Sequence, residues 1–474
     1  MAKLLWVTIL SCIILGAITV TQVHGEILES LPFLGQFLNA EGSLGFLEIL
    51  RSAIANFLTG ARWMWLGVLT LLSLVYTAWL VVRKILSILF SPLNLHRALG
   101  DLGYTEIEGV KSQKDVANIV RRRRKIGDVP PVYPNGWFSL IASRDVPKGQ
   151  ARSVSVLGQH FAVFRGEDGK AYILDAYCPH MGANIGIGGR VIDNCLQCPF
   201  HGWTFRGEDG KCVNIPYAKK IPDIAKTKQW PCFEANGQIM VWHHAEGIDP
   251  TWMPEVMPEI DTGDWTFKGK TVHIINAHIE EIPENGADLA HLHHLHKPFI
   301  AAGVDLRYIY NPIYAMFSHK WVAQWEPLPA PDQHIGELNL VHSIEVWGYT
   351  IPFTTLSVTV HQVGPGLVNL KFKSVFGSGV FIQTLTPEEP MLQRLTHEIY
   401  YDWWMPAFLP KLMLRGEAMQ VDRDVMIWNN KTYVSKPMLV KEDQLIAKHR
   451  RWYSQFFSEN SPRLSFQKEN NSEW

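Results

Sequence analysis

Two short loops between residues 178 and 201 each combine one cysteine with one histidine. The first reads Cys178-Pro-His180 and the second reads Cys198-Pro-Phe-His201. Two thiolates and two imidazoles could hold one zinc ion tetrahedrally, or a [2Fe-2S] cluster with both histidines on one iron. A zinc finger expects a cysteine pair followed by a histidine pair, whereas here each loop offers one of each. The pattern therefore favours the iron-sulfur cluster.

Cys195 offers an alternative ligand, because it forms a Cys-x-x-Cys pair with Cys198. Using that pair would leave His180 or His201 without a role. Neutral histidine ligands raise the reduction potential of a [2Fe-2S] cluster well above that of an all-cysteine cluster. Such a cluster is an electron relay, so a second site must receive the electrons.

A second group of metal-binding side chains lies within residues 284–296, which read ENGADLAHLHHLH. Asp288 and His291 are one helical turn apart, as are His291 and His294. His291 and His296 share a face only if the helix bends or ends between them. Four histidines within six residues predict a metal site, and their spacing leaves the choice of ligands open.

The cluster loops belong to a stretch rich in short strands. The Pro-rich sequence VPPVYPNGW, from Val129, marks the start of a domain. The β-rich runs SVSVLG, HFAVF and AYIL follow, separated by turns such as Gly-Glu-Asp-Gly, and a late run reads QIMVWHH. We expect an all-β domain over residues 134–250 with the cluster loops at its tip.

The second histidine group opens a region of mixed pattern, residues 251–474. Segments such as TLSVTVHQV and LVNLKFKSVFG alternate as strands, and a long helical region near the end is broken by Pro406 and Pro410. This predicts an α+β catalytic domain, an antiparallel sheet flanked by helices. No G-x-G-x-x-G opens a helix after a strand, so NAD(P)H must supply its electrons through a separate protein.

The N-terminal region predicts attachment to a membrane. Residues 4–20 carry no charge and read as a signal peptide or a first span within an apolar segment, 1–25. Residues 63–82 are uncharged, with aromatic side chains at both ends, and predict a transmembrane helix. A basic linker over residues 83–133 follows. Its positive charges place the C-terminal bulk in the cytosol, and we expect the membrane to be that of the endoplasmic reticulum.

Composition limits the remaining classes of function. A chain of 474 residues with 47% hydrophobic residues and 18 tryptophans predicts two or three well-packed domains. The formal net charge of −1 argues against a nucleic-acid partner. Six clustered cysteines are too few for a disulfide framework and suit a reducing compartment.

The two metal motifs together resemble those of the Rieske-type oxygenases. The pattern C-x-H, seventeen residues, then C-x2-H with Gly202 and Trp203 following, is similar to their Rieske signature. E-x3-D-x2-H-x4-H, starting at Glu284, resembles their mononuclear iron motif. The resemblance implies four cluster ligands: Cys178, His180, Cys198 and His201.

At the second site, the resemblance implies that His291 and His296 bind Fe(II). It also implies that Asp288 lies between this iron and the Rieske cluster of a neighbouring subunit, in a homotrimer. The sequence VDRDVMIWNNK resembles the third-ligand region of the steroid-acting branch at Asp424, with Asp422 as the alternative. Two histidines and one carboxylate leave iron positions open for O2 beside a substrate.

Within this class the chain is similar to the Neverland-type cholesterol 7-desaturases of animals. The likeness rests on the N-terminal anchor, the core CPFHGWTF and the ending DVMIWNNK…RRWYSQFF. It implies 7,8-desaturation of cholesterol coupled to reduction of O2, in steroid hormone biosynthesis. A steroid or other polycyclic hydroxylase is the alternative. A membrane-bound Rieske electron carrier is a further one, but it would need no second metal site.

Overall fold

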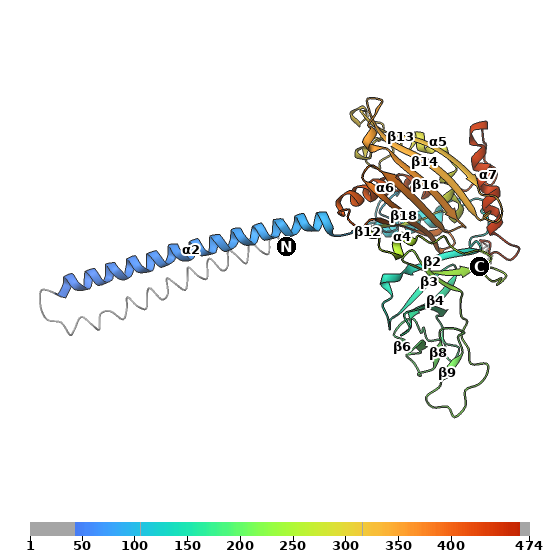
Figure 1. Ribbon diagram of the computed structural model, residues 1–474, viewed down its shortest axis with the longest axis horizontal. Coiled ribbons are helices and arrows are strands. Elements are labelled where there is room, and N and C mark those ends of the chain that lie inside the picture. Colours follow the sequence, from blue (N-terminus) through green and yellow to red (C-terminus); the bar gives the residue numbers. More distant parts are fainter. Residues whose placement is uncertain (1–42, 105, 315, 465–474) are drawn as a thin grey trace. The chain divides into compact units, whose positions relative to one another are not determined.

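The computed structural model describes residues 43–104, 106–314 and 316–464 (Figure 1). The chain divides into two compact units, the first ending at Ile85 and the second running from Leu86 to Trp474. The apolar segment expected over residues 1–25 lies outside the described residues.

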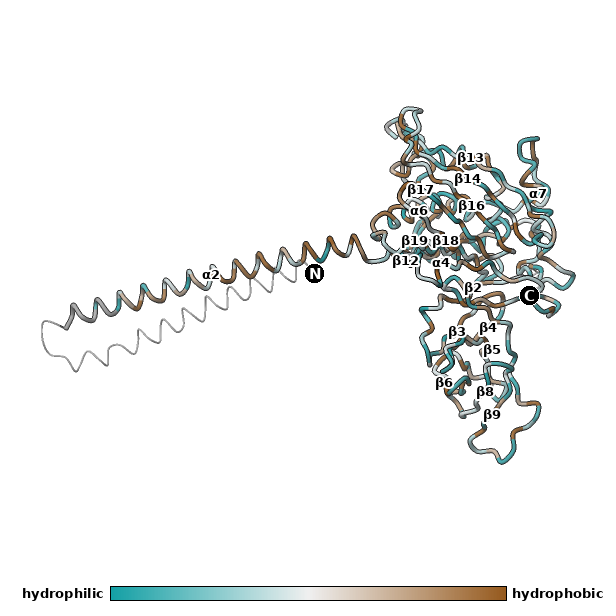
Figure 2. The backbone as a smooth tube through the Cα atoms, viewed as in Figure 1, coloured by the Kyte–Doolittle hydropathy of each residue, from teal (hydrophilic) through white to brown (hydrophobic). Residues whose placement is uncertain are grey.

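The first unit consists, in its described part, of most of one long helix, α2 (Ser43–Phe90). Its stretch Arg51–Phe90 is long and apolar enough to cross a membrane, and it contains the expected span of residues 63–82. Apolar side chains along it, such as Trp63 and Leu71, are exposed. Figure 2 shows the hydrophobic colouring along this helix. An exposed apolar helix of this length indicates tethering to a membrane.

The N-terminal part of the second unit holds three small antiparallel sheets. One sheet contains β2 (Gly136–Ala142), β10 (Cys232–Ala235) and β11 (Gln238–His243). Another contains β3 (Ala151–Val156), β4 (Gln159–Arg165) and β5 (Ala171–Asp175). The third contains β6 (Arg190–Ile192), β7 (Cys195–Gln197), β8 (Thr204–Arg206) and β9 (Cys212–Asn214). Together they form the expected all-β domain.

The C-terminal part is built on a nine-stranded sheet in the order β1-β12-β19-β18-β17-β16-β14-β13, with β15 paired to β14. The strands are β1 (Leu93–Arg97), β12 (Trp265–Ile275), β13 (Phe317–Pro327), β14 (Ile335–Val346), β15 (Tyr349–Thr350), β16 (Leu356–Val363), β17 (Leu367–Ser374), β18 (Gly377–Glu389) and β19 (Leu392–Asp402). All neighbours are antiparallel except β1 and β12, which run parallel. The α+β class is confirmed, with this one parallel pair making the sheet mixed.

Helices accompany the large sheet. The α-helices are α3 (Gln113–Arg123), α4 (Pro258–Asp261), α5 (Leu289–His294), α6 (Phe408–Trp428) and α7 (Gln444–Tyr453). The 3-10 helices are η2 (Ser143–Asp145), η3 (Ile279–Glu281), η4 (Pro283–Gly286), η5 (Ile300–Ala302), η6 (Pro312–Tyr314), η7 (Pro352–Thr354), η8 (Lys441–Asp443) and η9 (Ser454–Phe456). Pro410 does not break α6 as expected, because it falls in the first turn, where a missing N–H leaves no helical bond unmade.

The stretch expected as a basic linker is folded onto the catalytic domain instead. β1 adds an edge strand to the large sheet, and α3 contains three of the five residues of the basic run. Arg124 donates hydrogen bonds to the main-chain oxygens of Asn276 and Lys431. Part of the basic run therefore holds this stretch against the large sheet, because the Arg124 guanidinium donates hydrogen bonds to carbonyls that follow β12 and α6.

A shared hydrophobic core joins the all-β domain to the large sheet. Phe161 and Ile173 of the β domain belong to the same buried cluster as Leu395 of β19 and Val421 of α6. All four are 5% exposed or less. The two domains of the second unit therefore pack together over apolar surface, which fixes the metal loops and the sheet in one framework.

Burial of Glu280, in η3, makes the stability of the folded chain depend on pH. The Glu280 side chain is buried and accepts a hydrogen bond from the Tyr433 hydroxyl at 3.2 Å. Burial, and then the neighbouring Glu284, raise the pKa of Glu280 to about 7. The folded state thus keeps a proton between about pH 4.5 and 7 that the unfolded chain releases, and stability falls as pH rises through this window.

Glu280→Gln should therefore raise the melting temperature at pH 8 and leave it nearly unchanged at pH 4.5. The expected gain in unfolding free energy at pH 8 is at most about 3 kcal/mol, from 1.36 kcal/mol per pKa unit. Glu281→Gln is the matched control, since Glu281 accepts from the His278 N–H and lies 3.3 Å from Lys431 Nζ. It should not stabilise the chain at any pH. Melting curves of the detergent-solubilised full chain would contradict this account if Glu280→Gln destabilised it at pH 8.

Candidate metal centres

The two cluster loops share one backbone shape. The carbonyl of Cys178 accepts a hydrogen bond from the Gly182 N–H at 2.8 Å, and that of Cys198 from the Gly202 N–H at 3.1 Å. Each cysteine N–H in turn donates to the carbonyl five residues on, at 2.9 Å in the first loop and 2.7 Å in the second. Both glycines have positive φ, 72° and 75°, which residues with a Cβ rarely adopt. The loops thus present their cysteines in equivalent ways.

The four predicted cluster ligands lie together at the tip of the β domain. Both cysteines are buried, and their thiols are in hydrogen-bonding contact. The rings of His180 and His201 lie beside each other, with centroids 4.7 Å apart. Two sulfurs on the inside and two imidazoles toward the surface suit a [2Fe-2S] cluster with both histidines on the outer iron.

The protonation of Cys178 is consistent with a site built for a metal. Burial, reinforced by the neighbouring Cys198, raises the pKa of the Cys178 thiol to about 11, although N–H groups of His180 and Met181 point toward its sulfur. A thiol with such a pKa stays protonated at neutral pH until a metal displaces the proton. Cluster assembly should therefore release protons.

Trp203 contacts one of the cluster histidines, whereas Cys195 lies apart from the four predicted ligands. Trp203 stacks on His180, with centroids 4.8 Å apart, and its indole N–H donates to the Tyr217 hydroxyl at 2.8 Å. This contact was not predicted from the sequence. Cys195 lies in β7 opposite Arg206, among the charges of nearby acidic side chains. The structure thus places Cys198, and not Cys195, beside Cys178.

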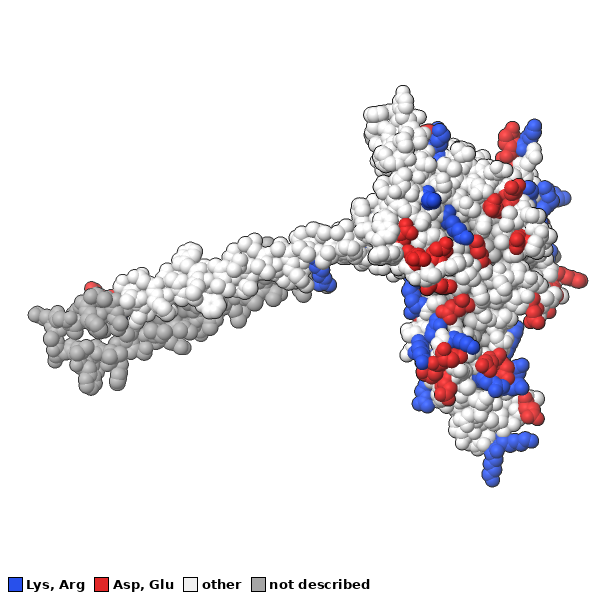
Figure 3. Space-filling model, in the orientation of Figure 1, with Lys and Arg blue, Asp and Glu red and all other residues white. Residues whose placement is uncertain are grey.

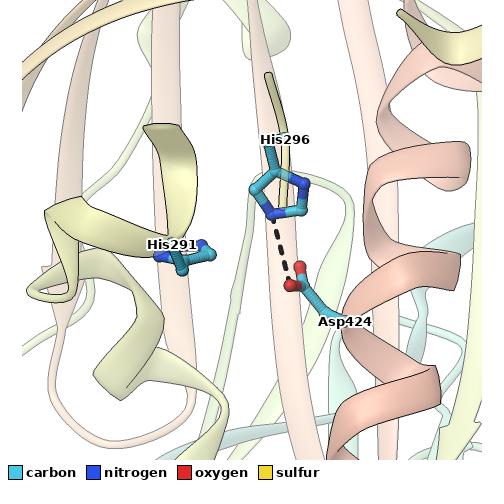
Figure 4. A group of neighbouring side chains, drawn as sticks. All are labelled: His291, His296 and Asp424. Atoms are coloured by element: carbon cyan, nitrogen blue, oxygen red, sulfur yellow. Dashed lines mark ion pairs between the residues drawn. The ribbon is translucent and has the colours of Figure 1, made fainter. Parts of the chain in front are cut away.

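The second site joins α5, the turn after it, and α6. The nitrogen atoms of His291 and His296 and a carboxylate oxygen of Asp424 all lie within 4.8 Å of one another (Figure 4). α5 ends at His294, so the chain turns before His296 and the two rings approach to 4.9 Å between centroids. Among the described residues, no other three His, Cys, Asp or Glu side chains bring one ligand atom each this close to one another. His293 and His294 are exposed instead.

The donor set fits a metal ion such as Fe(II). His296 Nε2 lies 3.2 Å from Asp424 Oδ1. That oxygen is buried and makes no well-formed hydrogen bond. Two donors about 2.1 Å from one ion and at right angles to each other are about 3 Å apart, so the spacing matches neighbouring ligands of a shared ion. Two histidines and one carboxylate form the facial set that leaves iron positions open.

Neighbouring groups orient both histidines for metal binding. His296 Nδ1 donates to Gln420 Oε1 at 2.8 Å, and His291 Nδ1 donates to the Asp288 carbonyl. The Nε2 atom of each ring is thereby left for the metal. Gln420 also accepts from Arg423 at 3.3 Å. Arg423 is fully buried and binds four carbonyls of the loop after α5, so it holds that loop against α6.

Gln420→Leu should lower the iron affinity of the second site and sterol turnover by about 10–100-fold, because His296 loses its orienting acceptor. Gln420→Glu is the matched control, since a carboxylate of the same length still accepts from His296 and should preserve iron binding. Metal analysis and turnover, measured on the same preparations, check both variants. Full iron occupancy and full turnover in Gln420→Leu would rule out this positioning role.

Asp288 caps α5 at the surface. Its carboxylate accepts from the His291 N–H at 3.2 Å, and its side chain is 31% exposed. An acid that lies between the iron and a neighbouring cluster would be expected to hold the His291 ring through its carboxylate. In the structure the main-chain carbonyl of Asp288 takes the ring N–H, and the nearest carboxylate oxygen is 4.0 Å from Nδ1. The carboxylate therefore remains partly available to a group outside this chain.

Asp422 points away from the second site. It is buried and contacts Arg97 at 3.0 Å and His273 at 3.1 Å. It lies two positions before Asp424, which places the two carboxylates on different faces of α6. Asp422 thus ties α6 to β1 and β12, whereas Asp424 faces the histidines. Glu284, from the same motif, pairs with Arg450 instead.

A largely apolar cavity lies beside the three clustered residues. Its walls include Trp321, Leu338, Val360, Leu370, Leu395 and Trp428, and the three clustered side chains also line it. Its polar lining includes His397, which contacts Gln383 at 2.9 Å and lies 3.6 Å from Glu417. Burial raises the pKa of Glu417 to about 7. Strands and helices distant in sequence supply these walls, so the sequence analysis could not find them.

Comparisons with known proteins agree with this geometry. The Rieske [2Fe-2S] domain model matches residues 136–231, and the 3-ketosteroid 9alpha-hydroxylase C-terminal domain model matches residues 241–457. NdmA of Pseudomonas putida CBB5, solved with caffeine, has the same fold. Its TM-score is 0.52 at 18% identity, over 67% of this chain and 89% of that chain.

Sequence relatives are closer. Cholesterol 7-desaturase nvd of Xenopus laevis is 50% identical over 400 residues, 83% of this chain and 88% of the relative. Cholesterol 7-desaturase nvd 1 of Ciona intestinalis is 51% identical over 389 residues, 82% of each chain. A probable 3-ketosteroid-9-alpha-monooxygenase oxygenase component of Rhodococcus rhodochrous is 31% identical over 345 residues, 70% of this chain and 82% of the relative.

A Rieske domain joined to an α+β domain with a two-histidine, one-carboxylate cluster defines the Rieske-type oxygenases, and this chain is one of them. They are oxidoreductases that act with O2 and use a [2Fe-2S] cluster, a mononuclear iron and a separate reductase. Within this class the chain belongs to the family of the animal cholesterol 7-desaturases.

Proposed function

We propose that this chain catalyses the O2-dependent 7,8-desaturation of cholesterol to 7-dehydrocholesterol in steroid hormone biosynthesis. The observation that carries the proposal is the His291, His296 and Asp424 cluster in the wall of an apolar, aromatic cavity. Support for the substrate comes from relatives with 36–51% identity that are named cholesterol 7-desaturases. The sterol loses one hydrogen from C7 and one from C8. These hydrogens, two electrons and two protons from the reductant convert O2 to two waters.

Each residue group has a distinct role in this reaction. Cys178, His180, Cys198 and His201 would hold the cluster, and His291, His296 and Asp424 would hold the iron at which O2 is reduced. The cavity walls exclude water and hold the sterol rings beside that site. Burial raises the pKa of Glu417 to about 7, so its carboxyl can hold and release a proton in the cavity near neutral pH.

We infer that electrons pass between chains. In Figure 1, β6, β8 and β9, which flank the cluster loops, lie at the opposite end of the second unit from α5. The partly exposed Asp288 carboxylate lies at the surface beside the second site. These positions support head-to-tail contact in which the cluster of one chain faces Asp288 of the next, and the resemblance to the Rieske-type oxygenases makes the assembly a homotrimer.

Mixing two inactive variants tests this arrangement. Cys198→Ala lacks the cluster but keeps the second site, and His291→Ala lacks the second site but keeps the cluster. Co-expressed chains should regain part of the turnover, because a cluster on one chain can serve the iron of its neighbour. Complete inactivity of mixed oligomers, shown to contain both chains, would exclude transfer between subunits.

Asp288→Asn should keep iron in the second site yet slow electron transfer from the cluster by about tenfold or more, because a neutral amide is a weaker acceptor than a carboxylate for a histidine of the neighbouring chain's cluster. The amide oxygen still caps α5, so stability should change little. Single-turnover reoxidation of the reduced cluster measures this step. Asp305→Asn, at an exposed carboxylate bound to Arg307, is the control. An unchanged transfer rate in Asp288→Asn would exclude the bridging role.

The second candidate function is hydroxylation of a steroid. The match to the 3-ketosteroid 9alpha-hydroxylase C-terminal domain favours it, and the same iron site could serve either reaction. Membranes containing the full chain, a reductase, NAD(P)H and cholesterol should yield 7-dehydrocholesterol, identified by mass spectrometry. A hydroxylated sterol as the main product would replace desaturation with this alternative.

We propose that the membrane is that of the endoplasmic reticulum and that the catalytic unit is cytosolic. Asn430 is exposed within the sequon Asn430-Lys431-Thr432, and its amide nitrogen donates to Gly103 and Met426 carbonyls at 2.6 and 2.9 Å. In the cytosol this residue stays unmodified. Protease added to intact microsomes should digest the catalytic unit. A protected fragment whose size falls with endoglycosidase would reverse the orientation.

A further inference from the structure

The end of the large sheet at which β14, β17 and β19 terminate carries exposed apolar side chains on its turns. Trp347 and Tyr349 follow β14, Val375 and Phe376 follow β17, and Trp403 and Trp404 follow β19. These six side chains, called the rim below, are 46–81% exposed. An exposed apolar surface of this extent marks a place of interaction.

The strand register brings the three turns to one end. β13 begins where β14 ends, since Phe317 pairs with Val346. β18 begins at Gly377 beside the end of β17, and Trp265 at the start of β12 pairs with Asp402 at the end of β19. A Cβ placed on Gly377 would lie 3.4 Å from the Trp404 ring, so the second and third turns touch. The three turns of the rim therefore lie along one edge of the sheet.

The rim continues into the residues with which the second unit begins. Leu86, Ile88 and Phe90 are 46–62% exposed and belong to the apolar stretch that can cross a membrane. Lys411 of α6 donates to the carbonyls of Ser87 and Ile88 at 2.8 and 2.7 Å. α6 follows directly after Trp403 and Trp404. The same end of the sheet thus receives the chain as it leaves that stretch.

Four of the segments that form this end carry no charged side chain, whereas the turn before β12 carries two exposed aspartates, Asp261 and Asp264. Residues 86–95, 346–356, 374–379 and 403–410 contain no Asp, Glu, Lys or Arg. At its border, Lys320 pairs with Glu345 at 3.2 Å, and Asp402 accepts from the Ser378 N–H and hydroxyl. Figure 3 shows almost no charged atoms over the loops that project beside β13 in this view. No unpaired carboxylate within these segments would oppose contact with lipid.

We propose that the rim is a second membrane contact, which seats this end of the catalytic domain in the interfacial layer of the bilayer. The occupant is the phospholipid surface itself. Tryptophan and tyrosine favour this layer, where an apolar ring and a polar N–H or O–H both find partners. The contact would act beside the proposed tether by α2 and would let a sterol pass from the bilayer toward the cavity with less exposure to water.

Photolabelling of the full chain in lipid nanodiscs tests the proposal without requiring turnover. The nanodiscs contain a phosphatidylcholine with a diazirine in its acyl chain, and illumination is followed by peptide mass spectrometry. We expect lipid adducts on peptides covering 347–353, 374–376 and 403–408, and also on α2. Phe200 and Tyr217, near the cluster, are 58% and 62% exposed and serve as internal controls that should remain unlabelled.

The outcomes separate the rim from the tether. Adducts on α2 alone, or crosslinks between chains at the rim, would overturn the rim contact and leave the tether. Adducts on the rim alone would support the rim contact and remove the tether, and adducts on neither would remove both. The double variant Trp403→Ser and Trp404→Ser should raise the KM for cholesterol in vesicles several-fold without changing kcat. An unchanged KM would also count against the rim.

Discussion

Replacing Asp424 with alanine is expected to reduce sterol turnover by more than about 100-fold while leaving the optical and magnetic signals of the cluster intact. Loss of a group that merely orients a metal ligand costs about 10–100-fold, and Asp424 faces the site directly. The cluster loops lie in a different domain and should assemble unchanged. Turnover, iron content and cluster spectra from one preparation measure all three effects.

Asp422→Ala is the matched control for this variant, two residues away on the same helix. Asp422 contacts Arg97 and His273 and should affect stability instead of iron binding. Folded Asp422→Ala protein should therefore keep iron in the second site and turn over cholesterol. Loss of that iron from Asp422→Ala, with retention in Asp424→Ala, would exchange the roles assigned to the two carboxylates.

Cys198→Ala is expected to remove the Rieske signals completely and to lower iron from about three to about one per chain, because a cluster iron loses its thiolate. Electrons then have no relay, so turnover should also vanish. Cys195→Ala, three residues earlier, is the matched control. This variant should keep the Rieske signals, because Cys195 lies in β7 near charged side chains and is not one of the cluster ligands. Loss of the cluster from Cys195→Ala would instead favour the Cys-x-x-Cys alternative.

The parts of both sites that are local in sequence could be predicted from it. The cluster ligands come from two loops within 24 residues, and His291 and His296 are five residues apart, so type and spacing alone indicated metal binding. Asp424 lies 128 residues beyond His296 and could be named only through resemblance to a family. Its position depends on the docking of α6 against the sheet, which no local pattern encodes.

Long-range packing also explains what the sequence analysis missed. β1 pairs with β12 across 176 residues, so a stretch expected to be a linker became an edge strand. Gln420 orients His296 only because α6 lies against the turn after α5. The side chains that line the cavity come from alternate positions on several strands. This alternation in the sequence indicates that one face of each strand is buried, but it does not indicate which strands are neighbours. Pro410 was expected to break a helix that begins only two residues before it.

The central claim is that this chain removes two hydrogens from a sterol while reducing O2 to water. The most direct test supplies the membrane-bound full chain with cholesterol carrying deuterium at C7 and C8, under ¹⁸O2, with a reductase and NAD(P)H. The account predicts a 7,8-unsaturated sterol that has lost one deuterium from C7 and one from C8 and contains no ¹⁸O, with the ¹⁸O recovered in water. A main product that retains one ¹⁸O atom as a hydroxyl group would contradict it.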